Sequence, residues 1–187
     1  MARQSFDDNH YLQLFISGSE DAFDAIFKRY YEGLLQFAKV LLPYPTDEAE
    51  DIVAEMFCTL WHNRRQIDIS TTLSAYLYVS VRNRVFDYYR KRKTIFNLPE
   101  EALAETADAG YQQPDHQLMY KDITSHIQSL VAQLPPQMRL VFKMHRYEGF
   151  SYDEIAGLLN ISLNSVKTHM FRALKFLKAA YPMLPIC

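Results

Sequence analysis

Residues 151–178 read SYDEIAGLLNISLNSVKTHMFRALKFLK, and this stretch decides the fold of the C-terminal part of the chain. Ser151 and Glu154 have the spacing of a capping box, which starts a helix. Asn160 is a residue type that tolerates the left-handed conformation with which many helices end. The pattern predicts two short helices around a tight turn. The apolar positions of the second helix are Val166, Met170 or Phe171, Leu174 and Leu177.

The second of these helices is polar and basic in its N-terminal half. A helix-turn-helix presents that part of its second helix to base edges in the major groove of DNA. A helical hairpin with an ordinary solvated face is the alternative for this segment taken alone. The outward-facing candidates for DNA contact are Asn164, Ser165, Lys167, Thr168, His169 and Arg172.

The N-terminal half of the chain carries three further apolar stripes at helical spacing. They predict helices over about 19–42, 46–62 and 73–93, separated by prolines at 43 and 45 and by an aperiodic loop at 63–72. The helix over 46–62 has an acidic face opposite its apolar stripe. Residues 94–115 are acidic, contain two prolines and a glycine, and show no sustained apolar period, which is typical of a linker. Two more helices are expected between this linker and residue 151.

Composition favours an all-α protein. Nearly half of the 187 residues are apolar and only five are glycine, and β-branched runs bounded by turns are hard to find. No stretch reaches the roughly 20 apolar residues of a membrane helix, and the N-terminus lacks a signal-peptide core. Cys58 and Cys187 have no nearby ligand cluster, so they are expected to be reduced cytosolic thiols. No metal-binding spacing, phosphate loop or nucleophile motif indicates catalysis.

The net charge of −2 conceals a strong segregation of charge along the chain. Residues 1–81 carry −6, residues 82–93 carry +5, residues 94–116 carry −5, and the remainder carries +4. Two basic segments separated by an acidic connector predict two contacts on one polyanion.

Together these segments resemble the extracytoplasmic-function (ECF) sigma factors, the minimal two-domain members of the sigma-70 family of bacterial transcription initiation factors. The resemblance rests on FKRYYEGLLQFA (27–38), DEAEDIVAEMFCTLW (47–61), LSAYLYVSVRNRVFDYYRKR (73–92) and the block 134–177. It implies an all-α fold of two small domains. A three- to four-helix bundle like sigma domain 2 would span 1–93, an acidic linker 94–115, and a helix-turn-helix domain like sigma domain 4 would span 116–187.

The resemblance also assigns roles to residues. The acidic helix would dock on core RNA polymerase through Glu48, Asp51, Ile52 and Glu55, with Ala54 standing where many relatives have glutamine. The loop would capture a flipped −10 base through Asn63, Arg64, Arg65, Gln66 and Asp68. The next helix would follow the −10 strand through Arg82, Arg84, Tyr88, Arg90, Lys91 and Arg92. The helix-turn-helix candidates named above would read the −35 element, with Lys167 and His169 where relatives often have arginine.

The implied protein is a non-catalytic, cytoplasmic transcription initiation factor without a cofactor or a small-molecule substrate. Its partners would be core RNA polymerase, through the β′ clamp helices and the β flap, promoter DNA, and an anti-sigma factor, which for proteins of this kind is often membrane-bound. The alternative is a stand-alone helix-turn-helix regulator. That reading leaves the acidic and basic helices over 46–93 without a role.

Overall fold

The computed structural model describes residues 7–42, 47–67, 69, 71–96 and 122–180, and omits the side chains of 92–96 and 122–126. Over this part of the chain the regular structure is helical throughout, with no strand, so the all-α prediction is confirmed. The chain divides into two compact units, Met1–Leu103 and Ala104–Cys187. None of the described helices is both long enough and apolar enough to cross a bilayer.

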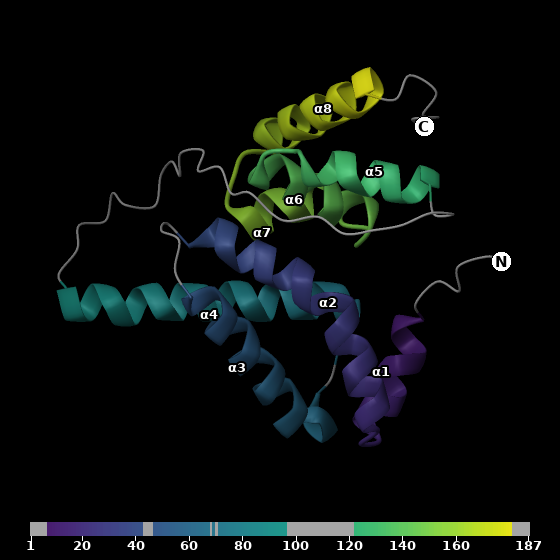
Figure 1. Cartoon of the computed structure of the whole chain (residues 1–187). Coiled ribbons are helices and arrows are strands. Elements are labelled where there is room, and N and C mark those ends of the chain that lie inside the picture. The colour runs from purple at the N-terminus through teal and green to yellow at the C-terminus, as the bar shows by residue number, and fades with distance from the viewer. Residues whose placement is uncertain (1–6, 43–46, 68, 70, 97–121, 181–187) are drawn as a thin grey trace. The chain divides into compact units, whose positions relative to one another are not determined.

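The first unit is built around a long central helix (Figure 1). This helix, α2 (Glu20–Leu41), packs against α1 (Asp8–Ile16), α3 (Glu48–His62) and α4 (Leu73–Phe96). A short 3-10 helix, η1 (Arg64–Gln66), follows α3 and contacts α1. The helix predicted over 73–93 continues to Phe96 and so includes the first residues assigned to the linker. The rest of that linker, 97–115, lies outside the described residues.

The predicted apolar stripes form the core of this unit. Ser19 begins α2, where its hydroxyl accepts a hydrogen bond from the Ala22 amide at 3.2 Å. Further along α2, Ile26, Leu34 and Phe37 are fully buried where the helix packs against α3 and α4. Full burial of such side chains stabilises a fold by roughly 1.5–3 kcal/mol each.

Helix α1 was not predicted, because the first helix expected from the sequence begins at about residue 19. Asp7 begins it by accepting a hydrogen bond from the His10 amide at 3.1 Å. Phe15 anchors it in the core with no exposed surface. The Tyr30 hydroxyl donates to the Asp8 carboxylate at 2.7 Å, which ties α1 to α2. The helix is short, and its single buried anchor gives too little periodicity to be recognised.

Helix α4 is covered on a wide arc because α1, α2 and α3 all pack against it. Leu73, Leu77, Val81 and Val85 are buried and form the apolar stripe of the helix predicted over 73–93. Tyr78 is also buried at 2% exposure, whereas Tyr88, a predicted contact of the −10 strand, is half-buried. Tyr78 lies edge-on to Phe37, with ring centroids 5.0 Å apart.

A contact between Tyr78 and Gly33 makes the first testable prediction. A Cβ atom at Gly33 would lie 2.8 Å from the Tyr78 hydroxyl oxygen. Because the Tyr78 ring is buried at 2% exposure, it cannot move away without disturbing the core. Overpacking of this kind costs about 1–3 kcal/mol, against the roughly 1 kcal/mol by which alanine improves on glycine in a helix. We therefore expect Gly33→Ala to lower the free energy of unfolding by about 1 kcal/mol, measured by urea denaturation with Trp61 fluorescence.

The matched control places the same alanine in a Tyr78→Phe background, where the hydroxyl oxygen is gone. There Gly33→Ala should be neutral or stabilising relative to Tyr78→Phe alone. An equal loss of stability in both backgrounds would contradict the steric explanation.

The described part of the second unit contains four helices, and the last of them packs against the other three. These are α5 (Asp122–Ala132), α6 (Pro136–Arg146), α7 (Tyr152–Leu159) and α8 (Leu163–Ala180). Pro136 occupies the first turn of α6, where its missing amide proton costs no hydrogen bond. Gly149 adopts a φ of 77° after α6, a conformation that favours glycine. Leu140, Val141 and Met144 of α6 form much of this core.

Candidate nucleic-acid interface

The first helix of the helix-turn-helix is fixed at both ends, as predicted. The Ser151 amide donates to the Glu154 carboxylate at 2.8 Å, and the Glu154 amide donates to the Ser151 hydroxyl at 3.3 Å. The bonds from Ser151 also lower the pKa of Glu154 below its usual range. Asn160 ends α7 in the left-handed conformation, with φ 54° and ψ 43°. The turn that presents α8 is therefore defined by its own local hydrogen bonds and backbone geometry.

The start of α8 is organised by Ser162. Its hydroxyl accepts a hydrogen bond from the Ser165 amide at 3.0 Å, and the two serine hydroxyl oxygens are 2.8 Å apart. Ser165, a predicted DNA contact, is half-buried and takes part in this cap. In the structure, Ser165 therefore helps to form the first turn of α8.

The outer face of α8 carries most of the predicted −35 contacts and one residue that the sequence reading left undecided. Asn164, Lys167 and Arg172 are exposed and Thr168 is half-buried. Phe171 lies among them and is 68% exposed. A largely exposed phenylalanine among cationic and amide groups would suit an apolar contact, such as one with the C5-methyl group of a thymine.

The buried stripe of α8 shows how Phe171 could have been assigned. Its members are Val166, Met170, Ala173 and Leu177. At about 100° per residue, Met170 lies about 40° from Val166 around the helix and Phe171 about 140° from it. Helix geometry alone therefore selects Met170 for the core.

His169 lies at the edge of this face and is half-buried. Its Nδ1 atom is buried and has no hydrogen-bond partner among the described residues. Burial, and to a lesser degree the charge of Arg172, lowers the pKa of His169 below the ordinary 6.5. The imidazole is therefore neutral at pH 7 and can offer only one N–H to a ligand.

The lowered pKa of His169 predicts a pH-dependent stability. The unfolded chain takes up this proton near pH 6.5 and the folded chain only at lower pH. The stability that depends on a neutral His169 is thus fully present above pH 6.5. It is lost as the pH falls through the pKa of His169 in the folded protein. We expect the wild type to lose protection from hydrogen exchange in α8 when the pH falls from roughly one unit above 6.5 to one unit below it. The His169→Gln variant should lose less protection over the same interval. Equal losses in the two proteins would exclude this role.

The loop between α3 and α4 begins with a residue that is held by the fold. Arg64 donates from Nη1 to the Trp61 carbonyl at 2.8 Å, and its guanidinium carbon lies 4.2 Å from the Trp61 ring centroid. A Cβ atom at Gly18, in the turn between α1 and α2, would lie 3.9 Å from Arg64 Nε. Arg64, predicted to contact DNA, therefore fixes the base of the loop. Asn63, Arg65 and Gln66, on either side of Arg64, are exposed, whereas Asp68 lies outside the described residues.

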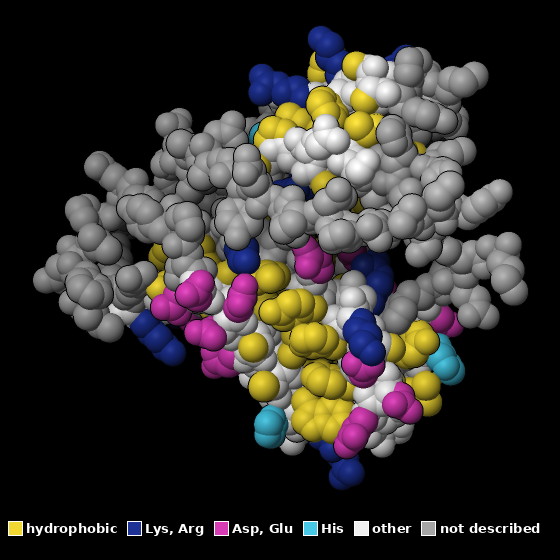
Figure 2. Space-filling view, in the orientation of Figure 1, with side chains coloured by type: hydrophobic (Ala, Val, Ile, Leu, Met, Phe, Trp, Pro, Cys, Tyr) yellow, Lys and Arg dark blue, Asp and Glu magenta, His cyan; other side chains and the backbone are white. Residues whose placement is uncertain are grey.

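Trp61 also belongs to an aromatic cluster between α1, α2 and α3. Its ring centroid lies 5.1 Å from that of Phe23 and 6.0 Å from that of Phe15. Phe27 extends the cluster, 4.8 Å from the Phe57 ring. Figure 2 shows hydrophobic side chains running as a band along the surface between α2 and α3. The cluster joins the start of the loop to three helices.

The basic residues of α4 do not form a single surface. Arg82 and Arg84 lie about 160° apart around the helix axis. Arg82 stacks on Phe86, with its guanidinium carbon 4.9 Å from the ring centroid, whereas Arg84 faces α3. Arg90 is exposed beside Asp87, with 3.4 Å between Nη1 and the carboxylate. Lys91 is exposed, and the side chain of Arg92 is outside the described residues. One straight DNA strand cannot contact Arg82 and Arg84 together.

The acidic face of α3 is accessible. Asp51 and Glu55 are exposed and Glu48 is half-buried. Figure 2 shows acidic side chains gathered over the N-terminal part of this helix. Ile52 is the exception among the four predicted polymerase contacts, because it is 5% exposed and packs in the core. It supports the acidic face from beneath and has no surface to offer a partner.

No group of histidine, cysteine and acidic side chains in the described parts of the chain is arranged to hold a metal ion. The site is thus a set of cationic, aromatic and acidic surfaces on helices. Such surfaces bind macromolecules through many separate contacts.

Comparisons with known proteins agree with this arrangement. Residues 26–95 match the family model described as sigma-70 region 2, and residues 126–177 match sigma-70, region 4. The chain therefore belongs to the sigma-70 family, the sigma factors of RNA polymerase. Within it, the chain is similar to two ECF RNA polymerase sigma factors of Bacillus subtilis (strain 168). It is 29% identical to SigW over 86% of this chain and 89% of that protein, and 27% identical to SigM over 84% and 94%.

This protein is an ECF-type RNA polymerase sigma factor. Among solved structures, it is similar to the sigma factor RpoE of Bartonella quintana, determined in complex with the anti-sigma factor NepR. The TM-score is 0.48 and the identity 21%, over 88% of this chain and 99% of that chain.

Proposed function

We propose that the two units of this sigma factor divide promoter recognition between them. Residues 1–93 dock on core RNA polymerase and take the −10 strand, residues 94–115 form a connecting linker, and residues 116–187 read the −35 duplex. The observation that carries the proposal is the exposed, cationic outer face of α8 on a complete helix-turn-helix. A helix presented in this way fits the major groove.

The first unit supplies the complementary surfaces. The exposed carboxylates of Asp51 and Glu55 suit a steered, salt-sensitive contact with a basic partner. The exposed side chains of Asn63, Arg65 and Gln66 in the loop can form hydrogen bonds to the edge of an extruded base. Exposed Arg90 and Lys91 can neutralise phosphates of the −10 strand.

The partners follow from this division. We propose that α3 binds the β′ clamp helices and that the second unit binds the β flap of core polymerase. An anti-sigma factor that covers these surfaces would hold the protein inactive. The protein would act in the cytoplasm, where the polymerase works, and would catalyse no reaction of its own.

The test is transcription in vitro with bacterial core polymerase, this protein and fragmented host DNA, with the 5′ ends of the transcripts mapped. We expect discrete start sites that share −35 and −10 motifs and disappear when the protein is omitted. Absence of protein-dependent transcripts, together with unaided binding to a palindromic duplex, would instead favour a stand-alone regulator.

A further inference from the structure

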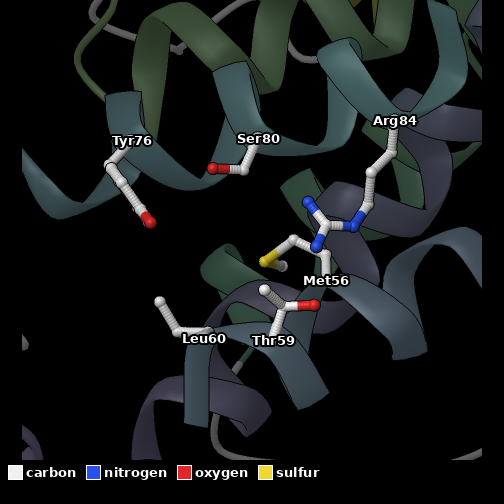
Figure 3. A pocket seen from close by; sticks show the side chains of 6 residues that line it. All are labelled: Met56, Thr59, Leu60, Tyr76, Ser80 and Arg84. Carbon is white, nitrogen blue, oxygen red and sulfur yellow. The ribbon is translucent and has the colours of Figure 1, made fainter. Parts of the chain in front are cut away.

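A small cavity opens in the groove between α3 and α4 (Figure 3). Its volume is about 20 Å³. Three side chains of α4 extend into it, at spacings of four residues, toward apolar and hydroxyl groups of α3. The lining residues are Met56, Thr59, Leu60, Tyr76, Ser80 and Arg84.

The α4 side of the cavity is a row of hydrogen-bond donors. Tyr76 and Ser80 offer hydroxyl groups and Arg84 offers a guanidinium group. No carboxylate lines the cavity, and among the described residues none forms an ion pair with Arg84. Arg84 Nε is buried without a hydrogen-bond partner in the described part of the chain. A positive charge in this setting favours an anionic ligand.

The size of the cavity restricts what that ligand can place inside it. A volume of roughly 10–15 Å³ is needed for a single water molecule. The cavity therefore accepts one oxygen atom of a larger group and excludes a nucleobase. Met56 and Leu60 form the apolar part of its lining.

The position of the cavity connects it to the proposed base-capture loop. Thr59 and Leu60 are in the last turn of α3 before η1, and Tyr76 is in the first turn of α4 after the loop. Arg84 lies about 12 Å further along α4. A strand that leaves the loop along this groove passes the mouth of the cavity.

We propose that this cavity is a phosphate subsite for the −10 strand. One non-bridging oxygen of a phosphodiester enters it and accepts hydrogen bonds from the Tyr76 and Ser80 hydroxyls and the Arg84 guanidinium. This inference rests on the proposed function and adds Tyr76 and Ser80 to the DNA-binding surface. It also gives Arg84 a role that Arg82, on the opposite flank of α4, does not share.

The test uses holoenzyme reconstituted with core polymerase and a promoter mapped by transcription. Each phosphate of the −10 non-template strand is replaced in turn by an uncharged methylphosphonate, and affinity is measured by fluorescence anisotropy. With wild-type protein we expect one position at which replacement lowers affinity about tenfold, the usual size of a lost charge-assisted hydrogen bond.

Arg84→Met keeps the aliphatic stem and removes the charge. It should lower affinity for unmodified DNA by a similar factor. With this variant, a methylphosphonate at the sensitive position should cause no further loss of affinity. The slope of log affinity against log salt should fall by about 0.7, as for one lost phosphate contact on a single strand. Tyr76→Phe and Ser80→Ala should each weaken sensitivity at the same position. Lys28→Met, an exposed cation on α2, is the matched control and should leave the profile unchanged.

Two results would overturn the subsite. One is a wild-type profile without any sensitive phosphate. The other is an Arg84→Met protein in which each methylphosphonate still lowers affinity as much as in the wild type. The loss from the variant and the loss from the modified phosphate would then be additive. Failure of the proposed function is recognisable separately, because the wild-type holoenzyme would then not bind the promoter at all.

Discussion

Replacement of both Asp51 and Glu55 by lysine is expected to reduce affinity for core RNA polymerase by on the order of 100-fold or more. Both carboxylates are exposed on the outer face of α3 and lie one turn apart, so a basic partner surface can contact them together. Reversing a charge at such a contact loses an attraction and adds a repulsion. The measurement is a competition assay for core polymerase against a labelled wild-type protein, repeated over a range of salt concentrations.

The control carries the same change of net charge on another surface of the unit. Asp24 and Glu32 are exposed on α2, and the Asp24–Lys28 ion pair at that surface contributes little to stability. Their replacement by lysine should leave polymerase affinity within a few-fold of wild type. An equal loss for both double variants would indicate a general effect of net charge and would remove α3 from the interface.

Replacement of Arg172 by alanine is expected to weaken binding of the holoenzyme to the −35 element about tenfold or more and to relax base preference at one position. A good contact to a base edge is worth about 1–3 kcal/mol of discrimination. Phe171→Ala should weaken binding less, and it should abolish any preference for thymine over uracil at one base pair. Because Phe171 is 68% exposed, its removal should leave the unfolding transition unchanged.

Phe176 is the matched control for Phe171. It is 39% exposed on the same helix and lies about 140° around the axis from Phe171. Phe176→Ala should leave the thymine preference intact. If Phe171→Ala also leaves it intact, the phenylalanine does not contact a thymine methyl group.

Local sequence signals predicted the helices of this protein well where one side of a helix is buried. The capping box at Ser151, the left-handed Asn160 and the alternating stripe of α3 each depend on residues within a few positions of one another. Such interactions are determined by helix geometry and need no knowledge of the rest of the fold.

The side chains at the edges of the buried stripes were harder to predict. Tyr78 and Tyr88 are both aromatic residues of α4, and only the packing of three neighbouring helices selects Tyr78 for the core. Arg64 and Arg82 look like free cations in the sequence, but each stacks on an aromatic ring that a basic-run pattern cannot reveal. Charge patterns predict that a segment binds a polyanion, and tertiary contacts decide which of its cations remain available.

The anchoring of Arg64 has a consequence for protein engineering. An exchange of residues 63–72 between relatives, made to test the proposed role of this loop in promoter preference, would treat the loop as a self-contained segment. In this protein Arg64, the first arginine of the loop, stacks on Trp61 and lies close to the turn at Gly18, and η1 contacts α1. The unit to transfer therefore includes two segments far apart in the sequence. A graft of the loop without Trp61 and without the turn at Gly18 would lack the contacts that hold Arg64 in place.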